Sequence, residues 1–224
     1  MLFRSIAQRQ GRAKNSNDLT QPAILKMMAM GGEGSIIDRL KQLHIVPLTI
    51  SYEYDPCDYL KAREYQLRRD VPYWKKTAED DMESMLVGIK GFKGHIFYRC
   101  APCIDEWLDT VDAEQPKNKL FDEIAAHIDR EIHSNYELYP CNYVALDMIQ
   151  DTKVYEEYYT SEDYQKFDEY INGQIEKIDI ENRDDHFLRI CLLTQYAYPA
   201  KNYIAASSEN GRFKSLLNRL TFKK

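Results

Sequence analysis

The sequence predicts an α/β fold: the C-terminal half of an α/β domain over residues 1–103, then an all-helical C-terminal region over residues 104–224. Three observations support this prediction. Helical spacing of apolar residues leads into an almost wholly apolar run at 45–52, which is the helix-then-strand order of α/β proteins. A second run, at 95–101, has the alternation of a strand. Beyond that run, every periodic segment has helical spacing.

Composition bounds the class of protein. The 224 residues are 44% hydrophobic and 29% charged, which is typical of a globular chain. The net charge of -6 provides no general basic face, so we expect no nucleic-acid partner. Five cysteines, an odd number at low density, argue against a disulfide scaffold and for a reducing compartment. Cys100 and Cys103 form a lone Cys-x-x-Cys pair without the second pair that a zinc site needs. We therefore expect no metal and no cofactor.

The first elements begin after a loop. Residues 11–20 are rich in Gly, Asn, Ser and Asp, which favour turns. Thr20 is then the expected helix N-cap, and Pro22 falls in the first turn, where proline is tolerated. This helix should reach Met30, where two glycines stop it. Apolar spacing predicts a second helix over 35–43.

The run at 45–52 is the clearest strand. It is β-branched and nearly all apolar, which is typical of a parallel strand covered on both faces. Pro47 lies near its start, where a missing backbone donor is tolerated. Charged segments at 57–69 and 75–90 are predicted helices, and two glycines mark the turn before the strand at 95–101.

The second part is predicted to be helical throughout. Phe121, Ile124, Ile128 and Ile132 form one amphipathic face. Pro199 should end or kink the last helix. No apolar run approaches the roughly 20 residues that a membrane-spanning helix needs. Further helices are predicted over 140–150, 161–178 and 184–207.

The sharpest local feature is a basic loop near the start. Three cations flank Gly11, and glycine lets backbone amides approach a ligand closely. Arg matches phosphate oxygens with a planar fork, and Lys adds a point charge. These properties describe a phosphate clamp; the alternative is a solvated basic loop that holds no ligand. The candidate substrate-binding residues are Arg9, Gln10, Gly11, Arg12 and Lys14.

This loop and the strand after it resemble two conserved blocks of the phospholipid/glycerol acyltransferase superfamily. Residues 7–14 (Ala-Gln-Arg-Gln-Gly-Arg-Ala-Lys) resemble the block that holds the acceptor phosphate, and the strand with Pro47 resembles the next block. Their order and interval both suit the family. The stretch from 31–34 (Gly-Gly-Glu-Gly) to 51–60 is similar to a bacterial subgroup with a long helical tail. The superfamily blocks lie within residues 1–55, and the likeness to the subgroup extends over most of the chain.

Two departures from the family pattern matter. Gln10 stands where the family usually has Glu, so the loop lacks a charge to orient a neighbouring Arg. The family's His-x-x-x-x-Asp block is absent, because none of the 5 histidines has Asp five positions later. In that block the His takes the proton of the attacking hydroxyl, and the carboxylate fixes the tautomer of the His. We therefore assign no catalytic residue, and we expect this chain alone to contact the acceptor phosphate without transferring an acyl group.

The resemblance implies an enzyme of phospholipid biosynthesis. It implies acyl transfer from acyl-CoA or acyl carrier protein to glycerol 3-phosphate or 1-acylglycerol 3-phosphate. The expected location is cytoplasmic, with peripheral attachment at the inner face of the membrane. We expect the native protein to begin upstream, so that this chain is a fragment. Two alternatives stay open: a non-catalytic helical interaction module, and a soluble binder of a phosphate ligand.

Overall fold

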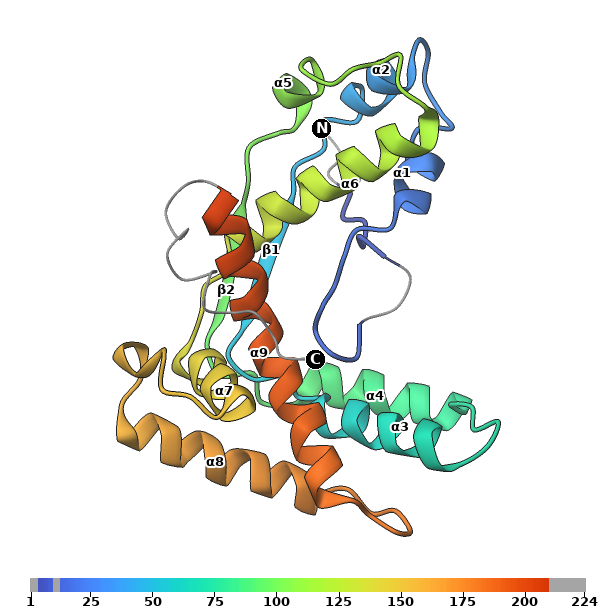
Figure 1. The fold of residues 1–224 in the computed structure, drawn as a ribbon. Helices are drawn as coiled ribbons and strands as arrows, with labels where there is room; N and C mark the ends of the chain where they lie inside the picture. Colours follow the sequence, from blue (N-terminus) through green and yellow to red (C-terminus); the bar gives the residue numbers. More distant parts are fainter. Residues whose placement is uncertain (1–3, 10–12, 210–224) are drawn as a thin grey trace.

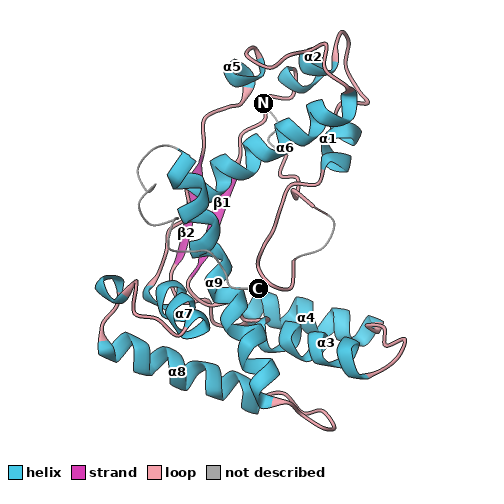
Figure 2. Cartoon of the chain, viewed as in Figure 1, coloured by secondary structure: helices cyan, strands magenta, loops and turns pink. Residues whose placement is uncertain are grey.

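The computed structural model describes residues 4–9 and 13–209. Within these ranges the chain is mostly helical, with one sheet of two antiparallel strands (Figure 1). Figure 2 shows the two strands side by side, surrounded by the helices that make up most of the described chain. The predicted mixture of helices and strands is confirmed at this level.

The elements of the first part follow the predicted order. Two of its helices begin at capping boxes, in which Ser35 pairs with Asp38 and Thr77 pairs with Asp80. This arrangement satisfies amides that the first turn of a helix leaves free. The helices are α1 (Pro22–Met28), α2 (Ile36–Lys41), α3 (Asp58–Asp70) and α4 (Ala78–Lys90), and the strands are β1 (Leu48–Tyr52) and β2 (Ile96–Cys100).

The second part is helical, as predicted. The predicted apolar face of its longest early helix is buried along its whole length. The last helix continues through Pro199, so of the two predicted effects, ending or kinking the helix, the first is wrong. The elements are α5 (Asp105–Leu108), α6 (Lys117–Ser134), α7 (Pro140–Gln150), the 3-10 turn η1 (Glu156–Tyr158), α8 (Ser161–Glu176) and α9 (Asp185–Glu209).

The sheet differs from the prediction in direction and in burial. β1 runs antiparallel to β2, with Ile50 opposite Tyr98, so the expected parallel strand covered on both faces is wrong. Thr49 and Ser51 point inward and are buried, whereas the apolar residues of β1 are exposed. The inner face meets the C-terminal turn of α6, where the Thr49 hydroxyl donates to the carbonyl of Ile132 at 2.9 Å. Carbonyls at a helix end lack partners within the helix, so polar side chains belong on this face. The outward row consists of Leu48, Ile50, Tyr52, Ile96 and Tyr98.

The described residues form two apolar cores. One joins α1 and α2 to α5 and α6, around the buried side chains of Leu40 and Ile124. The other joins α3 to α7, α8 and α9, around Phe167 and Leu192. Figure 1 places these two groups of helices at opposite ends of the sheet, with α9 running between them. Each core includes residues from both sides of the predicted boundary at residue 103.

Candidate functional site

The predicted phosphate clamp is only partly described. Gln10, Gly11 and Arg12 lie outside the described residues. Arg9, just before them, extends toward the loop's own acid: its Nη1 atom lies 3.6 Å from Oδ1 of Asp18. Both side chains remain about one-third exposed (27% and 34%), so solvent screens the pair and a competing anion can reach Arg9.

Lys14, two residues after Arg12 in the sequence, contacts α3. Its ammonium group forms an ion pair with Glu64, whose side chain is only 10% exposed and also accepts from Arg68. Glu64 thus holds two cations. A phosphate that recruited Lys14 would have to compete with this carboxylate, although Arg68 would remain to neutralise it.

The two segments that carry the family resemblance are anchored to the same turn of α6. Thr20, at the end of the basic loop, gives Oδ1 of Asp129 two hydrogen bonds, from its amide at 2.8 Å and its hydroxyl at 2.6 Å. Thr49 of β1 donates to the carbonyl of Ile132, three residues further along the same turn. The helix therefore brings together two segments that are separated in the sequence by α1 and α2.

Pro47 sits immediately before β1 rather than within it, and its side chain is buried. Its carbonyl accepts from the amide of Ala101 at 2.9 Å, and the carbonyl of Ile45 accepts from the amide of Ile104 at 3.0 Å. These bonds continue the antiparallel pairing past the end of both strands. The residue before Ile45 and the residue before Ile104 therefore meet at one end of the sheet.

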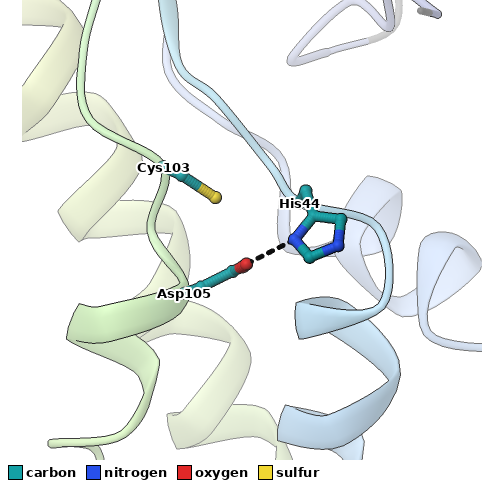
Figure 3. A group of neighbouring side chains, drawn as sticks. All are labelled: His44, Cys103 and Asp105. Atoms are coloured by element: carbon teal, nitrogen blue, oxygen red, sulfur yellow. Dashed lines mark hydrogen bonds and ion pairs between the residues drawn. The ribbon is translucent and has the colours of Figure 1, made fainter. Parts of the chain in front are cut away.

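A group of three chemically different donors lies at this end of the sheet (Figure 3). Nδ1 of His44 lies 2.6 Å from Oδ2 of Asp105, and the Sγ atom of Cys103 points toward both. One ligand atom from each residue lies within 4.8 Å of the others. The His44 side chain is 68% exposed and that of Asp105 21% exposed. The thiol is not an activated nucleophile, because burial raises the pKa of Cys103.

Sequence reasoning found Cys103 but missed its two partners. A metal site was not expected because the sequence has no second Cys pair. His44 and Asp105 are separated in the sequence by the whole segment that contains β1 and β2. The missing signal was the strand direction. Antiparallel pairing of the two predicted strands places the residue before the first beside the residues after the second. Cys100, the other half of the Cys-x-x-Cys pair, lies within β2 and does not belong to the group.

A separate buried polar network serves the fold. Asp58 is fully buried at the start of α3, and its Oδ2 accepts from the hydroxyls of Tyr170 at 2.7 Å and Tyr196 at 2.6 Å. Burial raises the pKa of this carboxyl to about 6, although the two tyrosine hydrogen bonds lower it. The network joins α3, α8 and α9 through buried hydrogen bonds, so we assign it to stability.

A row of exposed apolar residues lies along α4. Met82, Met85, Leu86 and Ile89 are 71%, 66%, 52% and 75% exposed. Their spacing places them along one face of the helix. The opposite face lies against the start of α3, where the backbone carbonyl of Ser84 accepts a hydrogen bond from the thiol of Cys57, the residue before α3. This row of four residues is hereafter called the α4 apolar face.

Comparison with known proteins finds no matching family model, no matching curated protein and no matching solved structure. Among the described residues, no helix combines the length and the apolar character needed to cross a membrane.

Proposed function

We propose that this chain takes part in glycerolipid acyl transfer as a peripheral membrane protein. In this proposal it contacts the acceptor phosphate and the lipid surface, and it contributes no catalytic base. The main support is the common anchoring of the two family-like segments. Thr20 attaches the end of the basic loop to one turn of α6, and Thr49 attaches β1 to the same turn. The C-terminal end of the loop is therefore held close to the strand.

The basic loop fits a phosphate monoester better than a carboxylate or a neutral ligand. Arg9 and Lys14 stand on either side of the segment that contains Arg12, and each is held by a single carboxylate neighbour. Together with Arg68, these three cations carry four positive charges, which match the two negative charges of a phosphate monoester and those of Asp18 and Glu64. Glycerol 3-phosphate and its 1-acyl form both carry this group.

The α4 apolar face is the surface that we assign to the lipid. Tyr73 before the helix and Phe92 after it are 96% and 74% exposed, and exposed aromatics at both ends are typical of helices that lie in a membrane interface. Three of the four acids of α4 have a cationic neighbour: Asp80 and Glu83 contact Arg63, and Asp81 contacts Lys76. Lys75 and Lys90 are exposed and can face anionic headgroups.

Binding to lipid vesicles tests the phosphate assignment. Vesicles that contain 1-acylglycerol 3-phosphate should bind the chain more tightly than vesicles that contain 1-acylglycerol. Arg12→Ala should remove this difference, because a charge-assisted hydrogen bond contributes about 1.5–3 kcal/mol, or about tenfold in affinity. Lys153→Ala, which changes an exposed cation outside the loop, is the matched control. Equal binding of the two lipids by the unaltered chain would overturn the assignment.

The transfer activity itself is tested with acyl-CoA and 1-acylglycerol 3-phosphate. The sample is the chain itself. We expect no turnover with acyl-CoA or acyl carrier protein donors, because the chain has no His-x-x-x-x-Asp pair. Turnover by the chain would overturn the assignment of no catalytic base. If the chain also binds the two lipids equally, a helical interaction module becomes the better explanation, with the α4 apolar face as its contact surface.

A further inference from the structure

The group of His44, Cys103 and Asp105 has the composition of a transition-metal site. It offers one imidazole nitrogen, one sulfur and one carboxylate oxygen, all within 4.8 Å of one another. Zn²⁺ binds these three ligand types at about 2.0–2.3 Å. Three donors around one ion lie roughly 3–4 Å apart when the ligand distances have these values. The observed group is therefore close to the required size, and the side chains need only small rotations.

The backbone holds the three residues in place without a metal. Hydrogen bonds from Ala101 to Pro47 and from Ile104 to Ile45 fix the two chain segments against each other. His44 has a left-handed backbone conformation (φ 48°), which is uncommon for a residue other than glycine. This turn directs its ring toward the other segment (Figure 3). The segments thus present their donors toward a common point.

Asp105 supplies a second, independent observation. Its Oδ2 atom is bonded to His44, but its Oδ1 atom is buried and has no hydrogen-bond partner among the described residues. A buried carboxylate oxygen without a partner is costly and calls for an explanation. A metal cation beside the carboxylate explains this oxygen, because the cation compensates the negative charge that the contact with His44 compensates only in part.

We propose that His44, Cys103 and Asp105 form a binding site for Zn²⁺ or a similar divalent transition metal. Three protein ligands leave the fourth tetrahedral position for water, and the exposed ring of His44 keeps that position accessible. Binding releases the thiol proton of Cys103, because the thiolate is the form that coordinates the metal. This site does not depend on the proposed role in glycerolipid metabolism, and it replaces the expectation of no metal.

Cobalt titration of the full chain tests the site. Co²⁺ takes the place of Zn²⁺, and a thiolate ligand gives a charge-transfer band in the near ultraviolet. We expect this band to saturate at one equivalent and to disappear when Zn²⁺ is added. Cys103→Ser should abolish it, and Asp105→Asn should weaken binding by at least about tenfold, since even outer partners of a metal site contribute about 10–100-fold.

Two cysteine controls keep the result specific. Cys100→Ser and Cys191→Ser alter thiols outside the group and should leave the band unchanged. Far-ultraviolet circular dichroism establishes that each variant is folded. Absence of a band in the unaltered chain, or a band that persists in folded Cys103→Ser, would overturn the proposal. Reaction of Cys103 with a thiol reagent gives a second readout. Zn²⁺ should protect Cys103 in the unaltered chain, and this protection should be lost in His44→Gln.

Discussion

Thr20 and Asp129 are joined by two hydrogen bonds across 109 sequence positions, both of them to the same carboxylate oxygen. Thr20 is buried, with 7% of its surface exposed. Burial raises the pKa of Asp129, while the two bonds from Thr20 lower it. The carboxylate is therefore a specific anchor for the end of the basic loop, and it supports the loop position on which the phosphate assignment depends.

The first prediction concerns this anchor. Asp129→Ala should lower the free energy of unfolding by about 1–3 kcal/mol, because it leaves the amide and hydroxyl of Thr20 buried without an acceptor. Thr20→Val removes only the hydroxyl bond and should cost less. Urea unfolding measures both, with Asp122→Ala, an exposed acid on the same helix, as the control. If the losses of unfolding free energy from Asp129→Ala and Thr20→Val simply add in the double variant, a direct interaction between the two residues is contradicted.

The second prediction concerns Asp58 and pH. Its pKa of about 6 in the folded protein lies above the ordinary value of 3.8, so the folded state binds the proton more tightly. The contribution of this group to stability therefore falls as pH rises from about 4 to 6 and is level above that range. Tyr196→Phe removes a hydrogen bond to the carboxylate, so it should destabilise the fold by about 1–3 kcal/mol at pH 7.

The same variant should cost less at pH 5, where more of the Asp58 carboxyl is protonated. Urea unfolding at the two pH values measures the difference. Tyr98→Phe, which changes a tyrosine that is 58% exposed, should have little effect at either pH. An equal loss for Tyr196→Phe at both pH values would indicate that Asp58 does not titrate in this range.

The third prediction concerns His127, whose ring stacks on Trp107 with centroids 3.7 Å apart and planes 5° apart. Burial lowers the pKa of His127 to about 4. The unfolded chain then binds the proton more readily, so this group favours the fold above about pH 6.5 and loses that effect as pH falls toward 4. This dependence opposes that of Asp58.

Tryptophan fluorescence isolates the His127 titration from the others. In a Trp74→Phe background, protonation of His127 should change the emission of Trp107 with a midpoint near pH 4. His127→Gln should remove the transition, and His186→Gln, on an exposed histidine, should leave it in place. A midpoint near 6.5, the ordinary value, would show that the ring is accessible to water.

Helices were predictable because their signals are local. The face of α6 follows from the spacing of Phe121 and Ile132, and capping chemistry marks the starts of α2 and α4. The sheet was not predictable in direction. Within the apolar run at 45–52, Thr49 and Ser51 alternate with apolar residues. This alternation indicates a strand with one buried face, but the apolar residues around it favoured a strand buried on both faces. Their inward orientation depends on the end of α6, which lies 83 positions away from Thr49.

The candidate sites divide in the same way. The basic loop is a local motif and could be read from the sequence, but its ion pairs with Asp18 and Glu64 depend on how the chain folds back. The metal-binding group could be read only in part, since His44 and Asp105 are brought together by strand pairing. The antiparallel pairing of β1 with β2, which joins residues far apart in the sequence, was therefore the information needed to predict both the sheet and the metal-binding group.

The last prediction concerns the α4 apolar face. Met85 and Ile89 contact no core and are 66% and 75% exposed, so replacing them should leave the stability of the fold nearly unchanged. Insertion of each side chain into a bilayer contributes about 1.5–3 kcal/mol when burial is complete. Partial insertion of both corresponds to at least about tenfold in affinity. Met85→Ser with Ile89→Ser should therefore release the chain from anionic vesicles in a flotation assay.

Matched variants distinguish binding through this face from non-specific hydrophobic binding to vesicles. Ile190→Ser changes an apolar residue of α9 that is 45% exposed and should not affect flotation. Lys75→Gln with Lys90→Gln should weaken binding to anionic vesicles while sparing neutral ones, because the lysines act on headgroup charge and the apolar side chains do not. Flotation that is unchanged in the Met85 and Ile89 variant would exclude the face as the lipid contact. The exposed row would then require a protein partner, because four apolar side chains on one helix face form a patch that favours burial.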